Sequence, residues 1–598
     1  MDEKKRDAFI KDIEKKHDAI AIDRQQMNEN FLGLLKRDFN TLINYSLLAI
    51  LLTIIVFFRN FELTLLTMFP IVLTGVVTAG ILYFLGLELN IFSTVVCTLV
   101  FGVGDDFSIF LTKAMQKEHT TGKNELPTYR ISIILAVFTT ILSIGSLIFA
   151  KHPALHSLAL VALIGMLSVI IITSTLYPFW FRFLIINRTK KGLSPITFRL
   201  FLHSVILFIY YGLGGLMFSA LGSVFVKNAK GKTLDIIKLI LAKFMKSVLY
   251  GNPFVKKKVI TNPNEDFSKP AIIIANHTSF LDTLAIGMTT HKIVYLVNDW
   301  VYDSPIFGKL VKALGFFPVS QGIENGKEKL KEKIDQGYSL VVFPEAERSY
   351  TNDIKRFHKG AFYLAEEFSL DILPLYIHGN SEVLPKGDFI IYDGSITVKV
   401  GDRISKDDLS FGTNYKERAK NINANFRNDF AKLRNEIEDE NYFKKKLFLS
   451  FLYKETEIVK EVKDDFNENK SVYFELNKYI AKDATILHIA DDYGQKDFLL
   501  TIQQAGRKIF SFIINKEKRE IAEQNYLVKR RKLNYIKNLS DINKTIDVLL
   551  ISDQNFDLSE IENFPETVIL LNTGNSFSDN PDFNLEHNSE SIKVLRRK

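Results

Sequence analysis

The sequence predicts a multi-domain protein in which an α-helical transmembrane bundle precedes two α/β domains. Four nearly uncharged apolar runs in the first 190 residues are each long enough to cross about 30 Å of hydrocarbon. Beyond about residue 235, short apolar runs alternate with amphipathic stretches, which is the pattern of buried strands separated by helices. The length of 598 residues allows about three or four domains.

Composition favours a protein that is partly embedded in lipid. Hydrophobic residues make up 47% of the chain although 24% of its residues are charged, so the apolar residues must be concentrated in particular segments. The net charge of +8 arises beside these segments, which favours anionic lipid as a partner. Nucleic acid is not expected, because the basic residues are interspersed with 68 acidic ones. The single cysteine, Cys97, lies in an apolar run, so we predict no disulfide and no metal site.

The bundle is predicted over residues 43–190, behind a polar N-terminal segment of residues 1–42. Because the first apolar run begins only after this polar segment, a cleaved signal peptide is not predicted. Basic residues follow the first span, lie between the third and fourth, and follow the fifth, which places these sides in the cytoplasm. The predicted spans are Tyr45 to Phe58, Leu63 to Leu87, Ile91 to Leu111, Ile131 to Ala150 and Ser157 to Leu184.

This orientation predicts a multi-pass protein of the inner (cytoplasmic) membrane whose residues after 190 all lie in the cytoplasm. Five spans then put the N-terminus outside. We therefore expect the chain to be the later part of a longer transporter, or to work with a separate first half.

The third span carries two neighbouring acids, Asp105 and Asp106, in the sequence FGVGDDFSIFLTKAM. Acids inside a span are costly and often mark proton or ion pathways, although a pair near the cytoplasmic end can simply be hydrated there. The stretch resembles the glycine-rich, Asp-Tyr-bearing helix in the C-terminal half of RND-type exporters of the MMPL class. The resemblance implies a proton relay at Asp106, beside Asp105, with Phe107 in place of the usual Tyr.

A further apolar stretch, Phe198 to Val226, is also long enough to span, and it contains the sequence GLGG. If it crossed the membrane, the rest of the chain would lie on the opposite face. Because three lysines follow it, we interpret residues 191–234 as a helical hairpin that lies in the cytoplasmic leaflet.

The second domain, predicted over residues 235–413, contains the stretch IIIANHTSFLDTLA at 272–285. Its apolar run is expected to be a strand, which His277 follows directly. Ser279 is a candidate helix N-cap with Asp282 at the N3 position, so Asp282 could merely complete a capping box. The same helical turn also brings the Asp282 carboxylate back toward His277, a geometry that orients an imidazole as a general base.

Three further blocks follow in order: GFFPVSQG at 315–322, VFPEAERSY at 342–350 and ILPLYIHG at 372–379. With NHTSFLD, they resemble the glycerolipid acyltransferase family that includes the lysophosphatidic acid acyltransferases. The resemblance implies that His277 deprotonates an acceptor hydroxyl while Asp282 orients the imidazole. No enzyme nucleophile is required, because the hydroxyl itself attacks the acyl thioester. The substrate-binding residues implied are Asn276, Ser279, Gly315, Gln321, Glu345 and Arg348.

The chain departs from this family where the acceptor phosphate is bound. Gln321 replaces the usual Arg, and Ala346 and Glu347 replace Gly and Thr of the Phe-Pro-Glu-Gly-Thr-Arg block, whereas Arg348 can still make a bidentate contact. Three nearby basic residues either restore positive charge or are solvated surface: Lys355, Arg356 and Lys359. Pro374 is expected to shape the acyl pocket.

A charged helical connector is predicted over residues 414–447, and a Rossmann-like α/β domain over 448–598. Its strands, in ATILHIADDYGQ, KIFSFIIN, TIDVLLISD and TVILLN, resemble the core of SAM-dependent methyltransferases. The glycine-rich turn is lost, with only Gly494 recognisable, and Asn515 stands near the usual ribose-binding acid. We expect a degenerate or structural module rather than an active methyltransferase, so SAM binding is not predicted.

Together these features predict a membrane-bound O-acyltransferase with no tightly bound cofactor. It would transfer a fatty acyl group from acyl-CoA or acyl carrier protein to the hydroxyl of a lysophospholipid or related lipid, with lipid export as a coupled step. Its expected partners are the bilayer, the acyl donor, the lipid acceptor and a separate exporter half. The alternative is a transporter component whose acyltransferase-like domain only recognises lipid.

Overall fold

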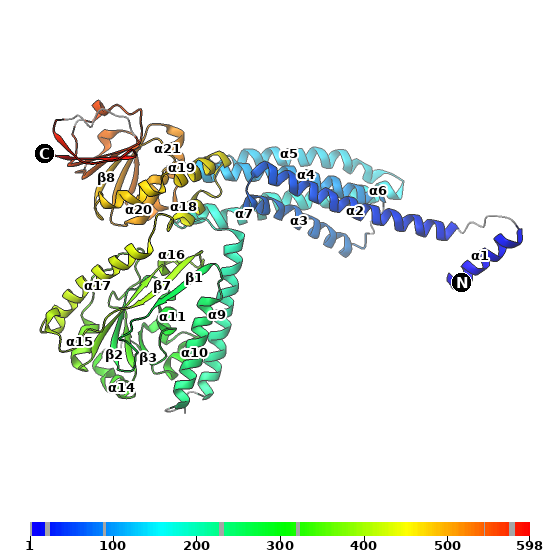
Figure 1. The fold of residues 1–598 in the computed structure, drawn as a ribbon. Coiled ribbons are helices and arrows are strands. Elements are labelled where there is room, and N and C mark those ends of the chain that lie inside the picture. Colours follow the sequence, from blue (N-terminus) through cyan, green and yellow to red (C-terminus); the bar gives the residue numbers. More distant parts are fainter. Residues whose placement is uncertain are drawn as a thin grey trace. The chain divides into compact units, whose positions relative to one another are not determined.

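The computed structural model describes residues 3–17, 24–87, 91–225, 232–318, 323–542, 544–561, 563–572 and 581–598. The chain forms two compact units. One contains the residues up to Asn187 together with Tyr453–Ile458, and the other contains the remainder. The predicted fold class is confirmed, with a helical region followed by two α/β sheets (Figure 1).

The first unit is helical. Its helices are α1 Glu3–His17, α2 Arg24–Phe58, α3 Phe61–Phe84, α4 Ile91–Thr121, α5 Leu126–Gly145 and α6 Pro153–Ile171. After α6 the helix continues through two π-helical turns, at 172–176 and 182–186, which flank α7 Tyr177–Phe181 and lead into α8 Asn187–Lys190.

Among the described residues of both units, five helical segments are long and apolar enough to cross a membrane: Thr41–Phe58, Phe61–Phe84, Leu126–Phe149, Pro153–Lys190 and Phe198–Ala220.

Small residues and hydroxyl groups hold this unit together. A Cβ on Gly165 of α6 would lie 2.8 Å from a methyl carbon of Val100 on α4, so glycine is what lets these two helices meet. Hydroxyl groups join three helices in one buried chain that runs from Thr67 through Thr112 to Tyr177. Without water in a bilayer core, such polar side chains are satisfied by one another.

The second unit begins its α/β part with a seven-stranded sheet of order β1-β7-β6-β2-β5-β3-β4. All five predicted strands are present, but β1 and β7 were missed, and β6 and β7 pair antiparallel. The strands are β1 Val255–Ile260, β2 Ala271–Ala275, β3 Ile293–Val297, β4 Phe317–Pro318, β5 Ser339–Val342, β6 Asp371–His378 and β7 Gly394–Val400.

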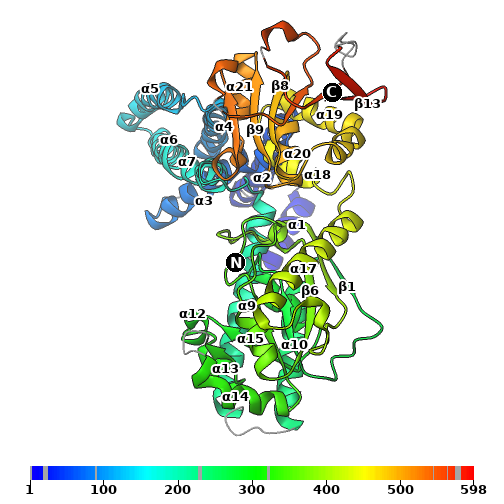
Figure 2. The ribbon, with the colours of Figure 1, turned by 90° about the vertical axis from the view of Figure 1, so that its left-hand side faces the viewer.

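Helices cover both faces of this sheet (Figures 1 and 2). α15 (Gly360–Glu367) and α17 (Tyr415–Ile437) bury one face, with Phe426 and Phe430 of α17 in the core. The segment predicted as a connector from residue 414 is therefore largely a structural layer of this α/β domain. Its remaining helices are α11 Leu281–Gly287, α12 Asp299–Tyr302, α13 Gly308–Ala313, α14 Ile323–Asp335 and α16 Asn380–Val383.

The predicted hairpin within residues 191–234 is wrong. Phe198–Phe225 forms one uninterrupted helix, α9, which packs beside α10 (Lys232–Tyr250) and against α11 and β7. The GLGG sequence does not break the helix; its glycines leave room for aromatic rings to pack against the helix backbone. A Cβ on Gly214 would lie 2.2 Å from the Phe244 ring, and one on Gly215 would lie 2.1 Å from the Phe307 ring.

A second seven-stranded sheet, of order β10-β9-β8-β11-β12-β14-β13, forms the C-terminal domain. Its first five strands in that order are parallel, as a Rossmann-like fold requires, and β13 and β14 add an antiparallel edge. The strands are β8 Thr485–Ala490, β9 Lys508–Ile513, β10 Leu533–Ile536, β11 Val548–Ile551, β12 Thr567–Leu571, β13 Phe583–Asn588 and β14 Ile592–Arg597. The helices beside them include α18 Lys444–Phe451, α19 Thr456–Glu475, α20 Gln495–Gln503 and α21 Lys516–Glu523.

Candidate active site

His277 and Asp282 meet where the central strand β2 ends. β2 is fully buried between β5 and β6, and the chain leaves its carboxyl end through a short loop into α11. His277 Nδ1 lies 2.9 Å from Asp282 Oδ2, the Asp282 side chain is inaccessible to solvent, and 20% of the His277 side chain is exposed. The imidazole is thus held by a buried carboxylate while part of the ring remains open to a reactant.

The Asp282 carboxylate also fixes the loop itself. Its Oδ2 accepts hydrogen bonds from the backbone N–H groups of Thr278 at 2.6 Å and Ser279 at 2.8 Å, and its Oδ1 accepts one from Asn380 Nδ2 at 2.6 Å. Capping of the turn and orientation of the imidazole were alternative interpretations of the sequence. In the structure one carboxylate does both.

Asn276 and Ser279, which were predicted to bind substrate, make hydrogen bonds within the protein. Both side chains are buried. The Asn276 amide exchanges two hydrogen bonds with the backbone of Ile377 on β6, and the Ser279 hydroxyl donates to the carbonyl oxygen of Leu384, which follows α16. These bonds fix the loop after β2 to β6 and to the segment after α16.

Glu345 supports the histidine loop from the other side. Its Oε1 accepts the backbone N–H of His277 at 2.8 Å, and its Oε2 accepts that of Lys355 at 2.8 Å. Burial raises the pKa of Glu345, against the two backbone donors that favour its ionised form. Phe343, in the same block, stacks on the imidazole with ring centroids 4.1 Å apart. Glu345 is not among the described residues that line the cavity discussed below.

Arg348 is the cation of this block. It lines the pocket described below, and no hydrogen bond or ion pair of its guanidinium is found among the described residues. The charge of Glu347 is offset, because Lys355 contacts its carboxylate at 2.5 Å and Lys386 lies 3.6 Å away. Lys355 therefore neutralises Glu347, one of the two roles left open for it.

Gln321 and Gly315 are the remaining predicted binding residues. Gln321 is outside the described residues. Gly315 occupies the turn before β4 with φ +76°, where a Cβ would lie 2.9 Å from Lys333, so its role there is conformational.

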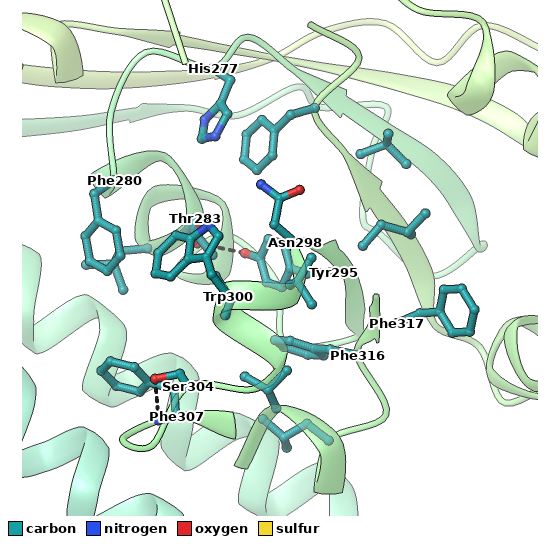
Figure 3. Close-up of a pocket in the computed structure, with 18 of the residues that line it drawn as sticks. His277, Phe280, Thr283, Tyr295, Asn298, Trp300, Ser304, Phe307, Phe316 and Phe317 are labelled. Atoms are coloured by element: carbon teal, nitrogen blue, oxygen red, sulfur yellow. Dashed lines mark hydrogen bonds between the residues drawn. The ribbon is translucent and has the colours of Figure 1, made fainter. Parts of the chain in front are cut away.

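An apolar cavity of about 370 Å³ begins at His277 (Figure 3). The ring of His277 lies at one end of the side chains drawn, and Phe307 lies at the other. Most of the lining is aromatic or aliphatic, and α9 and α10 contribute a wall through Tyr211, Phe218 and Phe244. Pockets of this size and character hold extended apolar ligands. Pro374 lies on β6 and is not among the described lining residues.

Sequence reasoning missed three parts of this site. Phe343 stood in a quoted block without a role, and Asn380 follows the last block directly. The wall supplied by α9 and α10 was also missed: α9 belongs to the segment interpreted as a separate membrane element, and no pocket role was predicted for α10.

In the helical unit, the two acids of α4 differ. Asp106 is exposed, whereas Asp105 is half-buried and its Oδ1 is a buried atom without a hydrogen-bond partner among the described residues. The geometry gives Asp105 the more enclosed position, although the resemblance implied Asp106 as the relay.

Two residues at the cofactor positions implied by the methyltransferase resemblance contact other parts of the C-terminal domain. The Asn515 side chain caps α21 by accepting from the backbone N–H groups of Glu517 and Lys518. Gly494, the remaining glycine of the turn, packs closely: a Cβ there would lie 2.3 Å from the hydroxyl of Tyr535.

The chain combines several helices that are long and apolar enough to cross a membrane with an α/β domain that is similar to acyltransferases. Residues 255–378 match the Acyltransferase family, and residues 26–181 match the MMPL family. The 1-acyl-sn-glycerol-3-phosphate acyltransferase of Cocos nucifera is 30% identical over 167 residues, which cover 27% of this chain and 52% of that protein. The chain spans 38% to 52% of the length of three such curated relatives.

Two solved structures are similar to separate parts of the chain. The 1-acyl-sn-glycerophosphate acyltransferase PlsC of Thermotoga maritima covers 40% of this chain and 96% of its own, at 19% identity and a TM-score of 0.36. A methyltransferase of Geobacter sulfurreducens covers 23% of this chain and 87% of its own, at 12% identity and a TM-score of 0.19. The helical region is thus similar to the MMPL family, and the first α/β domain is similar to acyltransferases.

Proposed function

We propose that this protein transfers a fatty acyl group from a thioester to the hydroxyl of a lysophospholipid or related lipid. The observation that carries the proposal is the placement of the His277–Asp282 pair at one end of the 370 Å³ apolar cavity. A reacting carbonyl can sit beside the imidazole while its alkyl chain is buried.

The chemistry needs only groups present in this chain. With Asp282 accepting a hydrogen bond from Nδ1–H, the free Nε2 of His277 accepts the proton of the acceptor hydroxyl. The acceptor oxygen bonds to the thioester carbonyl carbon, the carbon–sulfur bond breaks, and the departing thiolate takes the proton from the imidazolium. The donor is acyl-CoA or acyl carrier protein, and no tightly bound cofactor takes part.

Arg348 is the group we assign to an anionic part of a substrate. Its guanidinium lines the cavity, and an unpaired guanidinium makes strong bidentate contacts with phosphate. Because Gln321 stands where the family has an Arg, a phosphate-free acceptor is the competing substrate class.

We place the acyltransferase domain at the cytoplasmic face of the inner membrane. Exposed apolar residues recur along one face of α9 at helical spacing, and these suit contact with lipid: Leu202, Ile206, Ile209 and Leu213. The opposite face of α9 is buried against the domain, so lipid and active site share one element.

Lipid export coupled to acylation is the second function we propose, and the enclosed carboxylate of Asp105 favours it. A separate exporter half would complete the helical unit. Asp105→Asn, expressed beside such a partner, should reduce export of the acylated lipid without changing acyl transfer in detergent. Unchanged export would remove the proton-relay role.

The decisive experiment measures thiol release from acyl-CoA by the full chain and by His277→Ala. Lysophosphatidic acid and a phosphate-free hydroxylated lipid are offered separately. We expect release that depends on His277, and the better acceptor reveals whether Arg348 serves phosphate. No release from either acceptor by folded protein would instead support a transporter component that only recognises lipid.

A further inference from the structure

A second histidine with two polar partners lies in the C-terminal domain, apart from the acyltransferase site. His488 is on β8 and is fully buried. Its Nδ1 lies 2.6 Å from Asp497 Oδ1, and its Nε2 lies 2.8 Å from Ser552 Oγ. Asp497 is also fully buried, whereas Ser552 is only half-buried. The hydroxyl is thus the accessible member of the three.

These residues gather where this kind of sheet places functional groups. The chain runs from β8 out to β9 and β10, and then returns to β11 on the other side of β8, so the strand order reverses between β8 and β11. Crevices outside the carboxyl ends of strands at such a point bind ligands in open α/β sheets. Ser552 directly follows β11, and Asp497 lies in the first turn of α20.

The hydrogen-bonding capacity of each group determines which of the three residues donates and which accepts. When the Asp497 carboxylate accepts a hydrogen bond from Nδ1–H, the neutral imidazole presents a lone pair at Nε2. The Ser552 hydroxyl is then the donor to Nε2. The other acceptor within its reach, the carbonyl oxygen of Ile489, is farther away at 3.4 Å. This is the order of nucleophile, base and orienting acid that activates a serine.

We propose that Ser552, His488 and Asp497 form a serine-nucleophile site that cleaves acyl esters or thioesters. Ser552 Oγ bonds to the carbonyl carbon while its proton passes to His488 Nε2. The carbon–oxygen or carbon–sulfur bond breaks, and the leaving alcohol or thiol takes that proton. A water, deprotonated by His488, then cleaves the acyl-serine ester and releases a carboxylic acid.

The test uses the full-length protein in detergent with a fluorophosphonate probe, followed by peptide mass spectrometry, and p-nitrophenyl butyrate as the ester substrate. We expect covalent modification of Ser552 and ester hydrolysis, both abolished in Ser552→Ala. The near-isosteric variants His488→Gln and Asp497→Asn should slow labelling at least tenfold. Ser559→Ala, which removes an exposed serine of the same domain, should label at the wild-type rate.

Two results would overturn the proposal. One is a folded wild-type protein whose Ser552 stays unmodified under conditions that label a serine esterase. The other is labelling of Ser552 at the same rate in folded His488→Gln, because an unactivated surface hydroxyl would behave in that way. A thermal melt of each variant, with the acyltransferase reaction as an internal measure of folding, separates loss of activation from loss of structure.

Discussion

Asp282 Oδ2 lies 2.9 Å from Nδ1 of His277 and also accepts two backbone N–H groups of the intervening loop. The loop and the imidazole are therefore fixed by the same buried carboxylate, and neither can move without the other. This relationship explains how a five-residue separation can serve both folding and catalysis.

Replacing Asp282 by Asn should separate these two duties. The amide oxygen can still accept from the loop, but a neutral amide does not stabilise an imidazolium. We expect kcat for acyl transfer to fall roughly 10²- to 10⁴-fold with a small change in Tm. Thiol-release kinetics and a thermal melt measure the two effects. Activity within twofold of the wild type would contradict the assigned role of Asp282.

Glu345 and Glu347 offer a matched pair two residues apart. Glu345→Gln keeps the shape but weakens the acceptor for the N–H groups of His277 and Lys355, so we expect kcat to drop about tenfold. Glu347→Gln breaks only contacts with two exposed or half-buried lysines, and solvent screens these contacts, so we expect little change in kcat. Equal losses in the two variants would show that the support of the His277 loop is unimportant.

Replacing two glycines of α9 by alanine should change the stability of the protein in opposite directions. At Gly215 an added Cβ meets the Phe307 ring, and such overpacking costs about 1–3 kcal/mol and narrows the cavity. At Gly212 nothing lies within 4 Å, so alanine should gain up to about 1 kcal/mol of helix stability. Chemical denaturation and the preferred acyl-chain length are the readouts. A Gly215→Ala variant as stable as the wild type would refute the close packing.

Ala346 adopts a left-handed backbone, φ +62°, at the position where related acyltransferases have Gly. An alanine there costs roughly 1–2 kcal/mol relative to the right-handed region, so Ala346→Gly should raise Tm. The same change in the helix interior, Ala365→Gly in α15, should lower Tm by removing helix propensity and a buried methyl group. Opposite signs are expected in thermal melts of the two variants, and equal signs would contradict the strain at Ala346.

Lys238 of α10 makes stability depend on pH. Burial, and to a lesser extent the nearby charge of Lys333, lowers the pKa of Lys238 to about 7, while the carboxylate of Asp235 acts in the opposite direction. The Lys238 Nζ lies 3.5 Å from the centroid of the Tyr338 ring. Between this value and the unfolded value of 10.5, only the unfolded chain binds the proton, so stability rises with pH across that window.

Lys238→Met removes this proton linkage. The variant should gain Tm over the wild type at pH 7, by about 2–4 °C for each kcal/mol, and the gain should shrink toward pH 10. Thermal melts at the two pH values test it. A Tm difference that is independent of pH would mean that Lys238 remains charged in the folded protein.

Local sequence patterns determined much of this protein. Long uncharged runs predicted the helices of the first unit, since only a helix satisfies its own backbone across hydrocarbon. Buried apolar runs such as that of β2 predicted five strands of the acyltransferase sheet. β1 and β7 were missed because lysines interrupt their apolar runs, VKKKVI and SITVKV. Both strands have partly exposed residues, which is why lysine is tolerated there.

The tertiary structure decided what depends on distant partners. The sequence alone determined that His277 and Asp282 lie close together, because they are only five positions apart where a strand turns into a helix. It did not determine that Asn380 would reach Asp282, that Phe244 and Phe307 would pack into the glycines of α9, or that Ser552 would meet His488. Those contacts join residues 30 to 98 positions apart, and only the packing of the folded layers brings them together.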